Sequence, residues 1–177
     1  MSISLENSAV LFIDFINDFN FERGDRLLQH TKEILPNVQR LKSFARKNNL
    51  PVIYINDHYD LWQSDFRKII SHCYNDRSKD VIEAIKPTDN DYFFIKPKHS
   101  AFFQTPLHSL LMQLKKTHLI MTGIAGDICI LFSAKDAHMY DYTLHVPENG
   151  MASNENQGNE YALYLMRTVM DANTEPI

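Results

Sequence analysis

Three residues of types that support nucleophilic chemistry follow short apolar segments of this chain: Asp14, Lys96 and Cys129. A carboxylate can accept the proton of a thiol, an ammonium group can stabilise the negative charges that result, and a cysteine thiolate is a strong nucleophile. If the three side chains meet in one cleft, they predict acyl transfer to the cysteine, with backbone N–H groups stabilising the oxyanion.

Each of these residues also has an ordinary structural alternative. Asp14 could cap a turn or form a salt bridge at the end of its strand, and Lys96 could be a solvated loop lysine. Lys98 competes with Lys96, because alternation along an extended segment places both on the same face. Cys129 could be a small buried apolar residue, the commonest role of a free cysteine. Cys73 falls in a predicted loop, and we expect it to be inert.

The segment TGIAGDICILF contains Cys129, six residues after Gly123. Gly123 and Gly126 permit a tight turn with unusual dihedral angles. Cys129 then falls in the first turn of the following helix. Unpaired backbone N–H groups and the helix dipole at that position favour the thiolate.

Apolar segments of strand length alternate with helical patterns along the whole chain. Strands are predicted over 9–16, 51–56, 92–95, 119–122 and 143–146, and helices over 26–49, 80–85, 105–117, 127–142 and 155–172. Pro36 is predicted to mark a kink or a new first turn, and Thr105 to cap a helix that has Pro106 at its first position. Residues 57–77 read as a loop with a short helix.

This alternation predicts an α/β fold with a buried parallel sheet that is covered by helices on both faces. In open sheets of this class, ligands bind beyond the carboxyl ends of the strands. Asp14, Lys96 and Cys129 all fall near such ends. We therefore expect one cleft at that edge of the sheet, with a small molecule as the substrate.

Composition favours a soluble globular protein with one domain over residues 1–177. The chain has 18 Lys+Arg and 22 Asp+Glu, a net charge of −4, and 44% hydrophobic residues. The negative charge argues against nucleic acid as a partner, and no apolar run is long enough to span a membrane. Two cysteines do not suggest a disulfide scaffold, and no basic segment precedes the first apolar run. We expect a cytoplasmic protein.

Three segments of the chain resemble the isochorismatase-like cysteine hydrolase superfamily, which includes nicotinamidases and N-carbamoylsarcosine amidases. They are AVLFIDFINDF, KPKHSAFFQTPL and TGIAGDICILFSAKDAHMYDY, and their order and spacing match the family. The resemblance implies a three-layer α/β/α sandwich around a mostly parallel sheet. It implies a catalytic triad of Asp14, Lys96 and Cys129, with Lys96 preferred to Lys98 because it precedes Ser100 by four positions.

The resemblance also implies details of the nucleophile turn. A cis peptide is expected at Ile124–Ala125, which would direct the backbone N–H groups of Ala125 and Cys129 at the oxyanion. The chain departs from the family at Ile16, where many members have a glutamine. Related enzymes are commonly dimers or tetramers, and we expect a homo-oligomer.

Metal-binding nicotinamidases have an Asp-x-His element, which this chain lacks. Asp57 and His58 are adjacent, so in an extended segment they would point apart. His72, His99 and the other histidines show no ligand spacing. We expect no metal and no other cofactor, and a cap of the following turn is the favoured role of Asp57.

The pocket walls are predicted from aromatic residues near the three reactive groups. Phe19 follows Asp14 by five residues, and Trp62 lies in the loop after the second strand. Either could instead be a packing residue, as most aromatic side chains are. His99 and Phe102, beside the lysine segment, are weaker candidates.

The favoured function is hydrolysis of a small amide, ureide or carbamoyl C–N bond through a thioester. One alternative is an isochorismatase-type vinyl-ether hydrolase, although the isochorismate-cleaving members lack the cysteine that this chain keeps. A second is a catalytically silent binding protein on the same fold. A flavodoxin-like nucleotide binder is disfavoured, because no glycine-rich phosphate loop follows the first strand.

Overall fold

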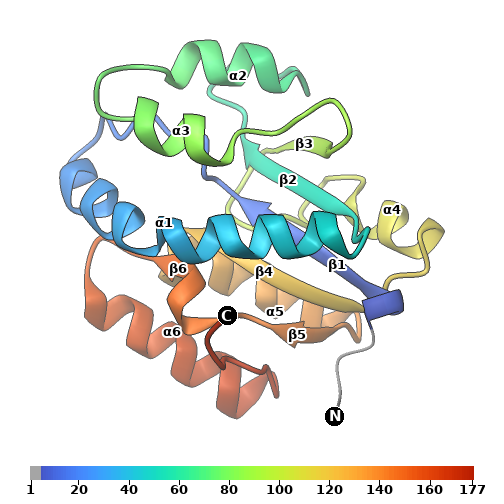
Figure 1. Cartoon of the computed structure of the whole chain (residues 1–177). Helices are drawn as coiled ribbons and strands as arrows, with labels where there is room; N and C mark the ends of the chain where they lie inside the picture. The colour runs from blue at the N-terminus through green and yellow to red at the C-terminus, as the bar shows by residue number, and fades with distance from the viewer. Residues whose placement is uncertain (1–4) are drawn as a thin grey trace.

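The computed structural model describes residues 5–177 and shows strands alternating with helices (Figure 1). The strands are β1 (Ser8–Ile13), β2 (Val52–Asp57), β3 (Tyr92–Lys96), β4 (His118–Ile124), β5 (Thr143–His145) and β6 (Met151–Ala152). The helices are α1 (Gly24–Lys47), α2 (Phe66–Cys73), α3 (Lys79–Ile85), α4 (Leu107–Gln113), α5 (Leu131–Met139) and α6 (Asn156–Val169). A π-helical turn, Gly126–Ile130, leads directly into α5.

The strand pairs of this described part of the chain are all parallel. The order across the sheet is β3-β2-β1-β4-β5, and β6 pairs with β4. From β1 the chain moves outward through β2 to β3, and it then returns to the other side of β1 as β4. A crevice forms where the strand order reverses in this way, beyond the carboxyl ends of the two central strands. The predicted three-layer sandwich with a mostly parallel sheet is confirmed.

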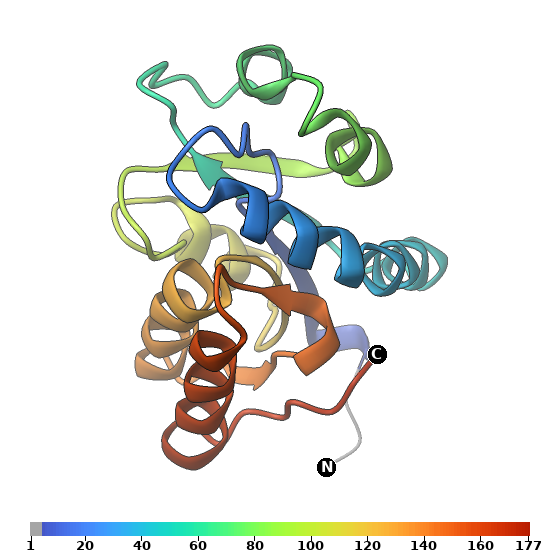
Figure 2. The ribbon, with the colours of Figure 1, turned by 90° about the vertical axis from the view of Figure 1, so that its left-hand side faces the viewer.

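Strand β1 contributes side chains to both apolar cores, and none of its residues is exposed. Ala9, Leu11 and Ile13 pack with α4, α5 and α6, whereas Val10 and Phe12 pack with α1 and α3. A strand covered on both faces needs apolar residues at every position, which explains the continuous apolar run in the sequence. Figure 2 shows α1 on one side of the sheet and α5 and α6 on the other.

The longest helix, α1, has 24 residues and is amphipathic. Its buried residues include Leu27, Val38 and Leu41, which face the sheet. The helix continues through Pro36 without a break. The lysine and arginine residues in its last turn interact favourably with the helix dipole. No helix between residues 5 and 177 is both long enough and apolar enough to cross a bilayer.

Helix α2 lies within the segment predicted as a loop with a short helix, and Cys73 is its last residue. The prediction that Cys73 lies in a loop is wrong. Its side chain is fully buried in a small cluster with Ile16, Ile69 and Ile82. Burial raises the pKa of the Cys73 thiol to about 12. The thiol is therefore protonated at neutral pH, and a protonated thiol is a poor nucleophile.

Two element boundaries differ from the sequence prediction in ways that affect the site. Strand β1 ends at Ile13, so Asp14 follows the strand instead of lying within it, and its φ of 56° turns the backbone sharply. A short carboxylate side chain tolerates this left-handed conformation better than most residues. Helix α4 begins at Leu107 with Pro106 as its N-cap, so the prediction of Thr105 as the cap and Pro106 as the first helical residue is wrong by one position. The Thr105 hydroxyl still accepts a hydrogen bond from the Leu107 N–H at 3.3 Å.

Candidate active site

The side chains of Asp14, Lys96 and Cys129 converge beyond the carboxyl ends of the central strands. Asp14 comes directly after β1, Lys96 is the last residue of β3, and Cys129 lies in the turn between β4 and α5. The Lys96 Nζ lies 2.8 Å from the Asp14 Oδ2 and 3.6 Å from the Cys129 Sγ. Residues that are far apart in sequence thus form one cluster with an acid, a cation and a thiol.

Asp14 and Lys96 form a buried ion pair. Their side chains are only 8% and 2% exposed, and the Asp57 N–H donates a second hydrogen bond to the other Asp14 oxygen at 2.8 Å. Burial by itself lowers the pKa of Lys96, but the Asp14 carboxylate and the Cys129 sulfur outweigh burial and raise that pKa above its ordinary value. The lysine is therefore cationic throughout the physiological range.

The alternative lysine, Lys98, is exposed at the surface. Only its carbonyl reaches the site, where it accepts a hydrogen bond from the Lys96 Nζ at 3.1 Å. Lys96 is the lysine that the sheet register brings to Asp14. Asp57, at the end of β2, pairs with Lys96 in the register, so the lysine side chain crosses the end of β2 to reach the acid.

The protonation of Cys129 differs from the sequence prediction. Burial and the nearby Asp14 carboxylate raise the pKa of the thiol above its ordinary value, and the Lys96 ammonium only partly opposes them. The expected preference for thiolate at the beginning of a helix is therefore outweighed. The resting site therefore holds a neutral thiol beside the Asp14 carboxyl group, an arrangement in which that group can serve as a general base.

The thiol lies at a cavity of about 330 Å³. The wall of this cavity is formed by the turn after β1, the end of β2, the start of α1, and the segments after β3, β4 and β6. The lining residues are Asp14, Asn17, Asp18, Phe21, Leu27, Asp57, Tyr59, His99, Ile124, Ala125, Ile128, Cys129 and Asn154. A cavity of this size suits a small molecule.

The two predicted aromatic walls lie elsewhere. Phe19 is fully buried in the core beneath α1, with a φ of 53° at its backbone, and does not line the cavity. Trp62 is 62% exposed and stacks on His58, with 3.9 Å between ring centroids. Phe21 and Tyr59 supply the aromatic surface instead. The direction of each ring depends on loop dihedral angles, and hydrophobic spacing does not specify these.

Of the two weaker candidates for the pocket wall, one lines the cavity and the other does not. His99 lines the cavity, whereas Phe102 is 7% exposed and packs against Tyr140 and Tyr142 in the core. Asp57 lines the cavity and also caps the following turn, since its Oδ1 accepts a hydrogen bond from the Tyr59 N–H at 2.9 Å.

Ile16, which stands where many members of the resembling family have a glutamine, does not face the cavity. Its side chain is 1% exposed and belongs to the cluster around Cys73. Its backbone is fixed by Asn56, whose side chain accepts a hydrogen bond from the Ile16 N–H at 3.1 Å and donates one to its carbonyl at 2.9 Å. The Asn56 side chain therefore holds the backbone of the turn after Asp14 in place through Ile16.

The turn that contains Cys129 is fixed by side chains that sequence reasoning did not identify. The Ser133 hydroxyl donates to the Cys129 carbonyl at 2.6 Å and accepts from the Ala101 N–H at 2.8 Å, so it ties the nucleophile turn to the lysine segment. The Ser153 hydroxyl accepts from the Asp127 N–H at 3.0 Å. The peptide bond Ile124–Ala125 is cis, as the family resemblance implied.

The residues near Asp57 do not fit a metal site. His58 stacks on Trp62, and its Nδ1 accepts a hydrogen bond from the Asp60 N–H at 2.9 Å. Within residues 5–177, no group of three or more His, Cys, Asp or Glu side chains is placed to hold a metal ion.

Comparison with known proteins shows which family the whole chain resembles. The isochorismatase domain model matches residues 8–174. An uncharacterised isochorismatase family protein of Bacillus subtilis is 50% identical over 170 residues, which cover 96% of this chain and 94% of that protein. A probable inactive nicotinamidase of Arabidopsis thaliana is 33% identical over 149 residues, which cover 77% of this chain and 75% of that protein.

A solved structure has the same fold. The nicotinamidase of Staphylococcus aureus superimposes with a TM-score of 0.74 at 24% identity, and the alignment covers 96% of this chain and 97% of that one. At this level of identity the match establishes the architecture alone.

Proposed function

The chain belongs to the isochorismatase domain family, and we propose that it is a cysteine hydrolase that cleaves a small amide, ureide or carbamoyl C–N bond through a thioester. The observation that supports this most directly is the cluster at the cavity. It places the Cys129 thiol 3.6 Å from the Lys96 ammonium group, which is itself paired with Asp14 at 2.8 Å.

In the first half of the proposed reaction, Asp14 accepts the proton of the Cys129 thiol as the sulfur attacks the substrate carbonyl. Lys96 remains cationic and stabilises the negative charge that moves from the carboxylate to the sulfur. Backbone N–H groups of Ala125 and Cys129 are assigned to the oxyanion, because amides at the beginning of a helix lack acceptors within the helix. Protonated Asp14 then donates its proton to the leaving nitrogen as the C–N bond breaks.

In the second half, water hydrolyses the thioester. Asp14, which is again a carboxylate, removes a proton from the water molecule as the water oxygen attacks the acyl carbon. Collapse of the tetrahedral intermediate breaks the C–S bond, and the proton on Asp14 returns to the Cys129 sulfur. The products are a carboxylic or carbamic acid and ammonia or an amine, and the site returns to its thiol form.

A second candidate is a catalytically silent protein that binds a small molecule on the same fold. The relative named as a probable inactive nicotinamidase favours keeping this candidate. The presence of all three reactive side chains in contact favours the hydrolase, since binding alone does not require a cysteine beside an acid and a lysine.

The test is turnover of a panel of small amides, ureides and carbamoyl compounds, with isochorismate as the vinyl-ether member. We expect Cys129→Ala to lower kcat by at least about 10³-fold on any amide that the wild type hydrolyses. The matched control is Cys73→Ala, which removes the other cysteine and should keep its activity. Mass spectrometry should detect an acyl adduct on Cys129.

Three results would contradict the proposal. Hydrolysis of amides by Cys129→Ala near the wild-type rate would remove covalent catalysis from the account. Cleavage of isochorismate alone would favour the vinyl-ether alternative, and no turnover of any member of the panel would favour the silent binding protein.

A further inference from the structure

The wall of the cavity at Cys129 is rich in negative charge. Asp14, Asp18 and Asp57 all line it. Lys96, the cation at its base, pairs with Asp14. Among the described residues, neither Asp18 nor Asp57 has a lysine, arginine or histidine nitrogen within ion-pair distance. The wall also contains three titratable side chains that are not carboxylates, namely Tyr59, His99 and the Cys129 thiol. Of these, His99 is exposed.

Two carboxylates of this wall keep an oxygen that can accept a further hydrogen bond. The Oδ1 atoms of Asp18 and Asp57 each accept one backbone N–H, from Asn20 and Tyr59, at 2.9 Å. The second carboxylate oxygen of each residue is left for another donor. Asn154 also lines the cavity, and its buried Oδ1 has no hydrogen-bond partner among the protein atoms. A ligand that offers N–H groups is complementary to such a wall.

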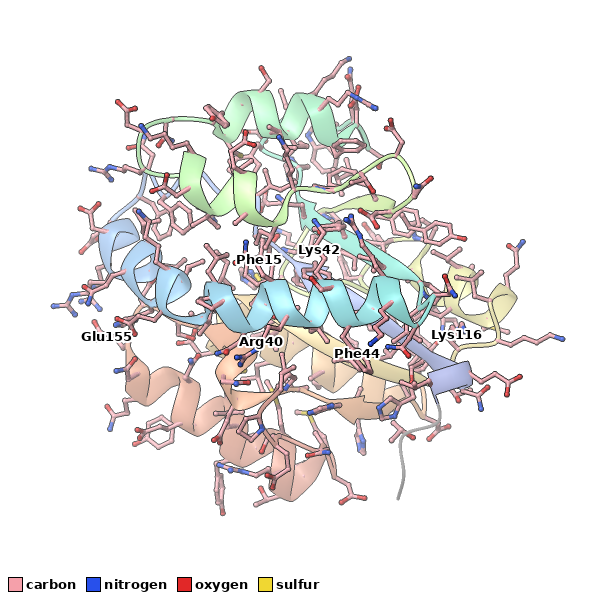
Figure 3. The ribbon with its side chains drawn as sticks, viewed as in Figure 1. Phe15, Arg40, Lys42, Phe44, Lys116 and Glu155 are labelled. Atoms are coloured by element: carbon pink, nitrogen blue, oxygen red, sulfur yellow. The ribbon has the colours of Figure 1, made fainter. Side chains whose placement is uncertain are left out.

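Two further cations line a separate hollow beyond Asn154. Arg23 and Arg26 line this hollow, and both form ion pairs with Glu155. Figure 3 labels Glu155 at the side of the molecule toward which β1 runs, opposite Lys116. The two arginine side chains are more than half exposed, so solvent screens their charge strongly. The cavity itself is therefore lined by three carboxylates, against the one ammonium group of Lys96 at its base.

Lys98 precedes the lining residue His99, and its side chain is exposed to solvent. Arg77 is another cation near this wall. It lines a polar hollow on the far side of Asp18, but its guanidinium group binds the Phe19 carbonyl at 3.2 Å and the Asp25 carboxylate at 3.2 Å. It does not pair with Asp18.

We infer that the cavity selects small amides or ureides that are neutral or carry an amino group, and that it disfavours substrates that carry a carboxylate. This inference rests on the proposed function, because the cavity is a substrate site only if Cys129 is the nucleophile. Its physical cause is repulsion between a carboxylate substrate and the carboxylates of Asp18 and Asp57, neither of which forms an ion pair, in a partly enclosed site where the effective dielectric constant is below that of water. The Lys96 ammonium group also attracts Asp57, but its ion pair is with Asp14.

The inference can be tested on Cys129 without knowing the substrate. The two probes are methanethiosulfonates of similar size, one with a trimethylammonium group and one with a sulfonate. Each transfers its thioalkyl group to the thiol sulfur and releases methanesulfinate. The rate constants for Cys129 are measured by mass spectrometry, and their ratio is divided by the same ratio for a free small thiol. The raised pKa of Cys129 cancels from this ratio, because both probes react with the same thiol.

We expect the cationic probe to be favoured by about tenfold in 0.15 M salt, as two screened negative charges near the thiol would produce. The preference should fall toward that of the free thiol in 1 M salt. A preference of threefold or less would overturn the inference. Failure of both probes to modify Cys129 would also overturn it, since the cavity would then be closed to small solutes. Cys129→Ala controls for reaction at any other site.

Matched variants identify the charges responsible. Asp18→Asn and Asp57→Asn remove one charge each but keep the oxygen that accepts the backbone N–H. Each should lower the preference, and the double variant should bring it close to that of the free thiol. Glu6→Gln is the control, because Glu6 is an exposed acid just before β1, at the opposite end of the strand. An equal loss of preference in this control would contradict the assignment to the cavity wall.

The substrate panel then distinguishes the inference from the proposed function. Hydrolysis of amides with a preference for those that carry a carboxylate would overturn the inference and leave the cysteine mechanism intact. A cationic preference of the probes without turnover of any amide would support the charge selection and overturn the proposed function.

Discussion

Removing one partner of the ion pair between Asp14 and Lys96 should destabilise the fold strongly, and the effects of changing the two residues should be strongly coupled. The two atoms of the pair are 2.8 Å apart, and the side chains are 8% and 2% exposed. Lys96→Met removes the cation and leaves the carboxylate with hydrogen bonds from the Asp57 N–H and the Cys129 thiol. Breaking a buried pair in this way costs about 3–5 kcal/mol, because an uncompensated charge stays in a site of low dielectric constant.

The double variant Asp14→Asn, Lys96→Met removes both charges and should be much less destabilised than the sum of the two single changes. We expect a coupling energy of at least about 2 kcal/mol, as found for residues in direct contact. The assay is urea unfolding followed by circular dichroism, with free energies of unfolding from linear extrapolation. If a single variant does not fold, the stability of the double variant still tests the reasoning.

The control is an exposed pair in which the same lysine replacement can be made. Lys86 and Glu83 of α3 are 2.6 Å apart, but their side chains are 47% and 51% exposed. Lys86→Met should therefore change the free energy of unfolding by less than about 1 kcal/mol. The reasoning is refuted if Lys96→Met costs no more than Lys86→Met, or if the two single changes at the buried pair add.

Two further predictions concern stability away from the three reactive groups. Cys73 has a pKa raised from 9.0 to about 12 in the fold, so the unfolded chain loses its proton first as the pH rises. The free energy of unfolding should fall between these pH values by up to about 1.4 kcal/mol per pH unit. Cys73→Ala should remove this contribution to the pH dependence of the free energy of unfolding. The same pH dependence in this variant and in the wild type would contradict the prediction. Gly123→Ala would bring a Cβ within 2.2 Å of the Ile13 carbonyl oxygen in β1. We expect a loss of at least about 1–3 kcal/mol in urea unfolding, with Gly158→Ala, which meets only the side chain of Asp127, as the milder comparison.

Most of the architecture and the location of the site follow from local patterns in the sequence. The run Ala9–Ile13 is apolar at every position because both faces of β1 are covered, and this pattern identifies a buried strand without reference to other segments. Alternation with helices makes the strands parallel, so their carboxyl ends share one edge. Asp14, Lys96 and Cys129 were therefore placed at the correct edge from sequence.

The tertiary structure decided which side chains face the cavity. Phe19 and Phe21 are two residues apart in the same turn, yet Phe19 is fully buried and Phe21 lines the cavity and is 44% exposed. The difference depends on backbone dihedral angles, such as the φ of 56° at Asp14 and 53° at Phe19, which no hydrophobic period encodes. Trp62 was misplaced for the same reason, since its ring stacks on His58 instead.

The protonation state of the site was also beyond sequence reasoning. The position of Cys129 at the start of a helix predicts a stabilised thiolate, but burial by surrounding segments and the Asp14 carboxylate keep it as a thiol. Sequence alone determined the reactive residue types and the edge of the sheet where they meet, because both follow from short stretches of chain. Their charge, and the acceptor-rich wall around them, were decided only by folding, because desolvation and proximity depend on segments distant in sequence.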